Sequence, residues 1–177
     1  MARQDGQLEL FALEPPAQEL DFSAERELAA RLPRHVRFGT SSWTFPGWAG
    51  IVYPHGTSER ELIDRGLQLY AKHPLLGSVG IDRSYYAPLE AATLARYAEQ
   101  LPSGFRCVMK VWNEITSAVH PKTREPNPRF FDAAVFENDV LAPILSDFAG
   151  HAGPLVFEIM PLSRRELSSP REFCALL

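Results

Sequence analysis

VRFGTSSWTFPGWAGIVYPHGTSERELIDRGLQLY, residues 36–70, contains one complete strand, loop and helix. Residues 36–42 are typical of a strand, and a loop rich in Trp, Gly and Pro follows them. Ser58 precedes a segment in which Leu62 and Leu69 lie at helical spacing, so we expect Ser58 to be the N-cap. This stretch therefore predicts one β-strand followed by one α-helix.

The same order of strand and helix recurs three times in the rest of the chain. The further expected strands are residues 78–86, 105–111 and 154–160, and the further helical segments are 89–101, 129–148 and 168–177. In the third of the four helical segments we expect Asn138 and Asp139 to cap a second helix, and Ser168 or Ser169 to cap the last one. Four alternations of strand and helix predict an α/β protein with a parallel sheet and right-handed crossovers.

The spacing of these units favours a parallel (β/α) TIM-type barrel. Residues 35–177 hold four units of about 36 residues, so eight units would need roughly 280 residues, close to the usual barrel length. We therefore expect half of a barrel, with free edges on its first and fourth strands. A chain that ends at Leu177 is then expected to be a fragment, to self-associate through these edges, or to be poorly soluble.

Composition excludes several other classes. The chain has 177 residues, of which 45% are hydrophobic and 23% charged, with a formal net charge of −4. These values exclude a strongly basic nucleic-acid coat and a disordered tail protein. Cys107 and Cys174 lie too far apart for a zinc finger or a Cys-x-x-Cys site. Without a signal-peptide pattern or a long apolar run, we expect a cytoplasmic protein with no membrane span.

The N-terminal segment is expected to be a flexible arm over residues 1–20, because it lacks a periodic apolar face and contains Pro15 and Pro16. A short amphipathic helix is expected over residues 21–34, ahead of the barrel at 35–177. Within the arm, one segment resembles the bacterial sliding-clamp-binding motif Gln-Leu-Ser/Asp-Leu-Phe. Its residues are Gln7, Leu8, Glu9, Leu10 and Phe11.

In this interpretation Leu10 and Phe11 enter a preformed apolar pocket of the clamp, while Gln7 makes directional hydrogen bonds. The alternative is that Leu8, Leu10 and Phe11 dock on the barrel or on the helix at residues 21–32 of the same chain.

Four segments resemble the DUF72 family, also called YecE-like proteins. They are FGTSSWTFPGWAGIVYP (38–54), VGIDRSYYAP (79–88), FRCVMKVWNEIT (105–116) and GPLVFEIMP (153–161). The resemblance implies a TIM-type barrel whose biochemical role is not established. The sequence departs from the family at several positions. Gly80 and Asp82 stand where the family has Glu and Asn, Ser117 follows Thr116 in place of His, and Glu158 replaces the usual Gln.

In a (β/α) barrel the carboxyl ends of the strands build the site. Lys110, Asp82 and Glu158 are therefore the candidate catalytic residues, with Lys110 stabilising an anion beside a carboxylate that acts as acid or base. The alternative is a structural ion pair between Lys110 and Glu158, and Asp82 has the same alternative with Arg83. The candidate ligand-binding residues are Ser42, Trp43, Trp48, Ser84, Tyr86 and Asn113.

Two loops can each be interpreted as a ligand-binding segment or as a structural one. Aromatic side chains in the first loop offer flat surfaces for a sugar or a base, or they pack to fix the loop. They are Trp43, Phe45, Trp48 and Tyr53. Basic side chains in the later loop form a lid that attracts phosphate, or a solvated surface. They are His120, Lys122, Arg124 and Arg129.

No motif specifies a metal or a cofactor. No two histidines are four residues apart and HExxH does not occur, so only a carboxylate site at Asp82 and Glu158 would be available to a metal. Two hypotheses therefore remain. The first is an enzyme-like barrel that binds a small polar or anionic ligand. The second is an accessory protein of DNA replication or repair, recruited to the sliding clamp through the arm.

Overall fold

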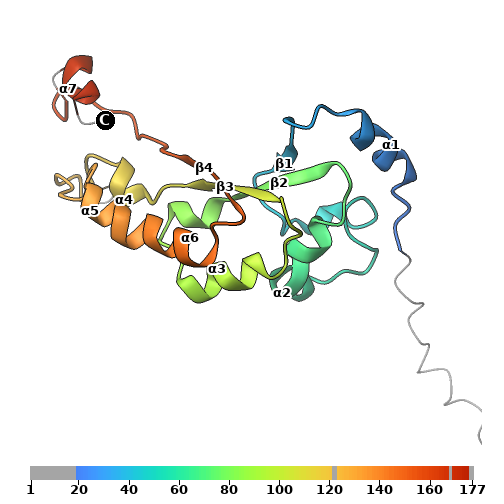
Figure 1. The fold of residues 1–177 in the computed structure, drawn as a ribbon. Helices are drawn as coiled ribbons and strands as arrows, with labels where there is room; N and C mark the ends of the chain where they lie inside the picture. Colours follow the sequence, from blue (N-terminus) through green and yellow to red (C-terminus); the bar gives the residue numbers. More distant parts are fainter. Residues whose placement is uncertain (1–18, 121–122, 168, 176–177) are drawn as a thin grey trace, which may run out of the picture.

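The computed structural model describes residues 19–120, 123–167 and 169–175, and its central element is a parallel sheet of four strands in the order β1-β2-β3-β4 (Figure 1). The strands are β1 (Phe38–Thr40), β2 (Leu76–Ile81), β3 (Arg106–Lys110) and β4 (Ala152–Val156). Each strand pairs with the next one along the chain. The expected α/β class with a parallel sheet is thereby confirmed.

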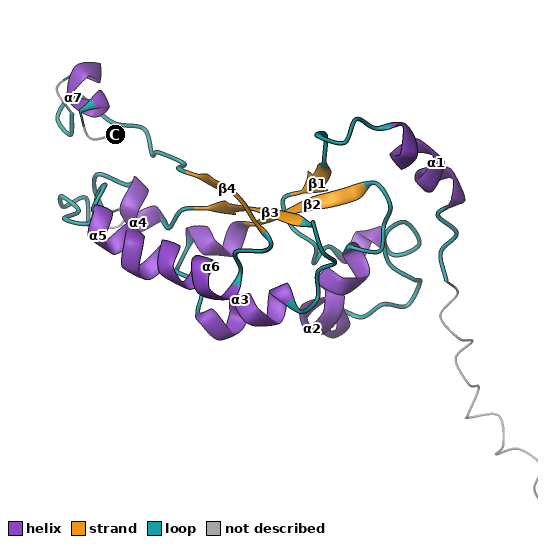
Figure 2. Ribbon diagram, in the orientation of Figure 1, coloured by secondary structure: helices purple, strands orange, loops and turns teal. Residues whose placement is uncertain are grey.

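Helices cover one face of this sheet and leave the other face open (Figure 2). The helix layer consists of α2 (Glu59–Tyr70), α3 (Ala91–Ala98) and a continuous helical stretch comprising α5 (Ala133–Val135), the π-helix Phe136–Leu141 and α6 (Ala142–Asp147). The remaining elements are α1 (Ser23–Arg31), the 3-10 helices Pro46–Trp48 and Asp82–Tyr85, α4 (Asn113–Thr116) and α7 (Pro170–Cys174). None of the helices in the described ranges is long and apolar enough to cross a membrane.

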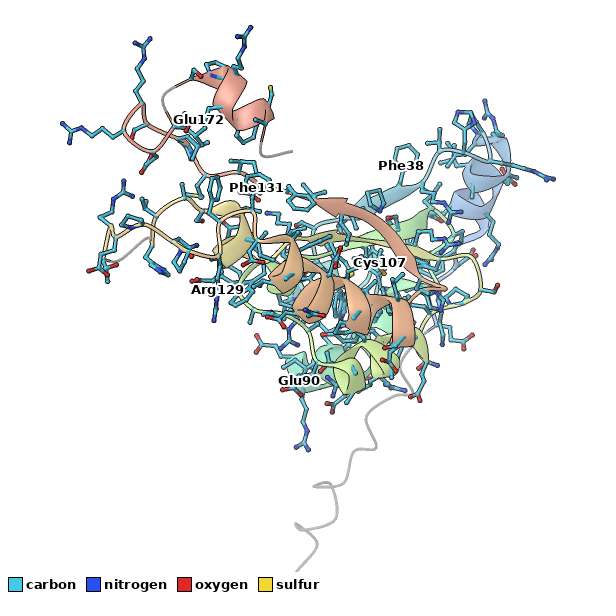
Figure 3. All side chains as sticks on the ribbon, turned by 60° about the vertical axis from the view of Figure 1, so that its left-hand side comes forward. Phe38, Glu90, Cys107, Arg129, Phe131 and Glu172 are labelled. Carbon is cyan, nitrogen blue, oxygen red and sulfur yellow. The ribbon has the colours of Figure 1, made fainter. Side chains whose placement is uncertain are left out.

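The alternation of side chains along the strands explains this one-sided packing. Val79 and Ile81 of β2, and Cys107 and Met109 of β3, are buried against the helices. The residues between them, such as Val108, are only partly buried and face a groove on the open side. Figure 3 shows Cys107 inside the packed layer and Phe38 at the surface beside it.

The cap residues of the helices were predicted with mixed success. The side chain of Ser58 accepts a hydrogen bond from the Glu61 amide at 3.2 Å, and Ser169 caps α7 in the same way, so both predictions are confirmed. The prediction that Asn138 and Asp139 cap a second helix is wrong. The backbone stays helical through these residues as a π-helix, whereas an N-cap needs extended backbone, and the cap at this place is Asp132.

The observed strands are also shorter or shifted relative to the expected ones. The second strand ends at Ile81, because residues 82–85 turn into a 3-10 helix. In this turn the Ser84 hydroxyl lies 2.6 Å from the Ile81 carbonyl oxygen. The fourth strand ends at Val156, so Glu158 lies beyond β4 and not within it as expected.

The expected short helix at residues 21–34 is observed as α1, Ser23–Arg31, which buries none of its own side chains. Its attachment to the remainder comes from the preceding residue, Phe22, whose ring meets the ring of His73 edge-on at 4.7 Å. Burial lowers the pKa of His73 below its ordinary value, so this ring is neutral at pH 7.

Candidate functional site

Three charged side chains meet at the carboxyl edge of the sheet. Lys110 ends β3, Asp82 follows β2, and Glu158 follows β4. The Lys110 Nζ lies 2.8 Å from Glu158 Oε2 and 3.8 Å from Asp82 Oδ1. The parallel strands carry their carboxyl ends to one edge, which is why residues distant in sequence converge here. The three residues that the sequence predicted as catalytic candidates are therefore brought together.

The environment of Lys110 favours its charged form. The hydrogen bond to Glu158 raises the pKa of Lys110 above its ordinary value and outweighs desolvation, which lowers it, and the charge of Asp82 adds a smaller raising effect. The Tyr85 ring adds a cation–π contact, with its centroid 5.5 Å from Nζ. Lys110 therefore stays protonated at neutral pH and can donate hydrogen bonds, but it cannot act as a base.

The cluster forms one end of a groove on the open face of the sheet. The groove has a volume of about 350 Å³, and Ser78, Gly80 and Val108 are among the residues that line it. Two of its lining residues are glycines for a steric reason. A Cβ at Gly39 would collide with the Ser78 carbonyl group, and a Cβ at Gly80 would lie 2.9 Å from the Ser41 carbonyl oxygen.

The residues around Ser84 divide into buried and exposed positions. Ser84 is buried, and its hydroxyl lies 2.7 Å from the Lys110 carbonyl oxygen, so it holds the 3-10 turn against β3. Tyr86 is 73% exposed and packs edge-on against Tyr85. Asn113 begins α4, directly after β3 and its following loop. Sequence reasoning missed Tyr85, although it lies between two predicted residues.

Of the predicted aromatic wall, Trp43 and Tyr53 belong to the hydrophobic core, Trp48 packs against it, and Phe45 is exposed. Trp48 lies against Tyr53 and Tyr70, with ring centroids 6.4 Å apart in each case. Trp43 is 7% exposed and contacts Tyr97 edge-on at 5.2 Å. Neither tryptophan lines the groove that contains Lys110. The geometry thus favours the alternative in which these rings fix the first loop.

Three of the basic side chains in the later loop contact acidic or aromatic side chains of the same chain. His120 Nδ1 lies 3.7 Å from Glu114, and an Arg124 amino group lies 3.6 Å from Glu166. The Arg129 guanidinium covers the Trp112 ring at 5.1 Å. These contacts favour a structural role over the phosphate lid, while Lys122 is outside the described residues.

Two other expectations meet different outcomes. Asp82 and Arg83 do not form the ion pair that was the alternative. Asp82 lies near Lys110, and an Arg83 amino group donates a hydrogen bond to the Tyr97 hydroxyl. A metal held by Asp82 and Glu158 would have to displace the Lys110 ammonium group, which already contacts both carboxylates. The arm motif at residues 7–11 lies outside the described residues.

The fold and this edge cluster define an α/β protein with a parallel sheet and a charged groove at the carboxyl ends of its strands. A family described as "Protein of unknown function DUF72" matches residues 37–176, so the chain belongs to the DUF72 family. The resemblance noted from the four sequence segments is confirmed. No curated protein and no solved structure matches the chain.

Proposed function

We propose that this DUF72 domain binds a small polar ligand rich in hydroxyl groups in the groove at the carboxyl edge of its sheet. The observation that carries the proposal is the Lys110 ammonium group, held by Asp82 and Glu158 beside the groove. An ammonium donates hydrogen bonds and carboxylates accept them, so the cluster matches hydroxyl groups, which do both. The Tyr85 ring beside Lys110 offers an apolar surface for the carbon skeleton.

The sign of the charge decides between polar and anionic ligands at this groove. One ammonium and two carboxylates give the Lys110 cluster a net charge of −1, which disfavours an anion at this end of the groove, while Arg37, which also lines the groove, donates a hydrogen bond to the Gly104 carbonyl oxygen. If the domain is an enzyme, Lys110 is the hydrogen-bond donor, and Asp82 or Glu158 exchanges a proton with the ligand. This role for Lys110 differs from that of an isolated cation that attracts phosphate.

The test is a ligand titration followed by ¹H–¹⁵N spectra with monosaccharides and polyols as probes. Lys110→Met should abolish saturable shifts at the groove and lower the melting temperature by only a few degrees, because the exposed ion pair contributes ~1 kcal/mol or less. Lys72→Met removes an exposed lysine from the end of α2 and should change neither property. Saturable binding that survives in Lys110→Met would refute the role of this residue, and no binding to any probe by the native chain would refute the proposed ligand class.

We also propose that the four strands form one side of a (β/α) barrel. Supporting this proposal are the parallel order of the strands and the helices on a single face. Parallel sheets are normally covered on both faces. Among the described residues β1 and β4 each have one neighbouring strand, so their outer edges are available for self-association.

A second candidate function rests on the five residues Gln7-Leu8-Glu9-Leu10-Phe11. We propose that they recruit the protein to a bacterial sliding clamp, which would place it in DNA replication or repair. The experiment is a solution titration of the full chain and of a Leu10→Ala/Phe11→Ala variant against the clamp. Micromolar binding that is lost in the variant is expected, and equal binding of both chains, or none, would refute this function.

A further inference from the structure

Among the described residues, two arginines without a carboxylate partner contact one buried tyrosine. Arg83, in the turn after β2, donates a hydrogen bond from Nη1 to the Tyr97 hydroxyl at 3.0 Å. Arg96, in α3, has its guanidinium carbon 5.9 Å from the centroid of the Tyr97 ring. Within the described ranges, neither arginine has an acidic group within ion-pair distance.

These arginines line a pocket with a volume of about 220 Å³. Ser42 and Thr44, from the loop after β1, line the same pocket, and their hydroxyl oxygens lie 3.2 Å apart. Tyr97, which both guanidinium groups contact, is 4% exposed and is held by the edge-on contact with Trp43. The pocket is therefore a concave surface lined by two guanidinium groups and two hydroxyl groups.

We propose that this pocket binds an oxyanion, the phosphate or carboxylate group of a small molecule. Guanidinium groups match the oxygens of such groups in charge and in planar geometry, and each can donate two hydrogen bonds at once. The Ser42 and Thr44 hydroxyls supply further donors. The single acidic residue among the lining residues, Asp82, lies 3.8 Å from the Lys110 ammonium group, which also binds Glu158, so Asp82 still adds a negative charge that the two arginines outweigh.

The pocket is separate from the groove proposed above, although Gly80 and Asp82 line both. The groove cluster has a net charge of −1, whereas the pocket carries two arginines against one shared carboxylate. Oxyanion binding here requires nothing of the groove, so the two proposals can fail independently. If both hold, the natural ligand carries its oxyanion and its hydroxyl groups on neighbouring positions.

The test uses inorganic phosphate and malonate as probes, titrated into the full chain while the Arg Nε–H signals are followed by NMR. Arg96→Gln is the principal variant, because the exposed side chain can change without disturbing the core. We expect it to weaken binding of the favoured anion at least fivefold, and Arg83→Gln to do the same. Arg60→Gln, on the exposed side of α2, is the matched control and should bind as the native chain does.

Asp82→Asn provides a test in which binding is expected to increase, a result that misfolding would not produce. Removing the one negative charge from the pocket should strengthen anion binding severalfold, with the same signals shifting. Preference for phosphate or for malonate then identifies which oxyanion the pocket takes. The proposal is overturned if neither anion binds saturably, if Arg96→Gln binds as tightly as the native chain, or if Asp82→Asn weakens binding.

Discussion

Lys110 at the end of β3 donates a hydrogen bond to Glu158 beyond β4, with 2.8 Å between Nζ and Oε2. This contact is the main cause of the raised pKa of Lys110. It also ties the segment after β4 to the edge of the sheet. Both side chains are partly exposed, so the pair stabilises the fold only modestly, by ~1 kcal/mol or less.

Glu158→Gln should therefore lower the pKa of Lys110, because it removes the charged acceptor of this hydrogen bond. Since the pKa is higher in the folded chain, the pair stabilises the fold at neutral pH, and this contribution is lost as the pH rises through the folded-state pKa. The measurement is an NMR titration of the Lys110 Nζ and Cε signals. Exposed Lys72 is the internal reference, and an unchanged Lys110 pKa in the variant would contradict the assignment.

The two thiols should differ sharply in reactivity. Cys107 is fully buried, and burial raises its pKa to about 12, whereas Cys174 is exposed. Ellman's reagent should therefore label one thiol quickly in the native chain and two after denaturation. Cys174→Ser should abolish the fast phase, and fast labelling of this variant would show that the layer between sheet and helices is open.

Thr116→Val should stabilise the protein. The Thr116 hydroxyl is fully buried and has no hydrogen-bond partner among the described residues. Replacing it with a methyl group of similar size removes an unsatisfied polar group and should raise the free energy of unfolding by about 1 kcal/mol.

The matched comparison is Thr40→Val. The Thr40 hydroxyl lies 2.6 Å from the Ser42 carbonyl oxygen and 2.9 Å from the Tyr70 hydroxyl, so its loss should destabilise the fold by about 1 kcal/mol. Urea unfolding of the two variants measures both changes. A loss of stability in Thr116→Val equal to that in Thr40→Val would mean that Thr116 has a partner after all.

The open face and edges of the sheet should drive self-association. Phe38 on β1 is 51% exposed and Val156 on β4 is 40% exposed. Sedimentation velocity should show the native chain as a dimer or larger species, and Phe38→Asp/Val156→Asp should shift it toward the monomer. Leu145→Asp, an exposed position on α6 on the other side of the molecule, is the control. A stable, well-folded native monomer would contradict the prediction.

Sequence patterns with strong local signals predicted the fold well. The Ser58 cap and the alternation of strands and helices depend on neighbouring residues alone, and both are observed. The convergence of Lys110, Asp82 and Glu158 was also predictable, because parallel strands carry their carboxyl ends to one edge. The π-helix through Asn138 was not, because capping residues inside a helix give the same local pattern as a new helix start.

The roles of individual site residues were less predictable, since they depend on partners far away in the sequence. Nothing near Arg83 indicates that it contacts Tyr97 and leaves Asp82 to Lys110. Trp48 resembles a binding residue because it lies beside Gly and Pro, but its contact with Tyr70 from α2 packs it against the core. Only tertiary contacts distinguish such residues.

Gly39 and Gly80 line the groove, and a side chain at either position would meet the main chain of a neighbouring segment, which sets a limit on how binding can change. Glycine has no side chain, so no substitution at these two positions can make the groove wider. A wider groove would have to come from smaller side chains elsewhere in its lining, such as Val108 or Val156, or from movement of the strands. A different preference at the same width needs only new side chains at the rim, where Asp82 and Glu158 lie.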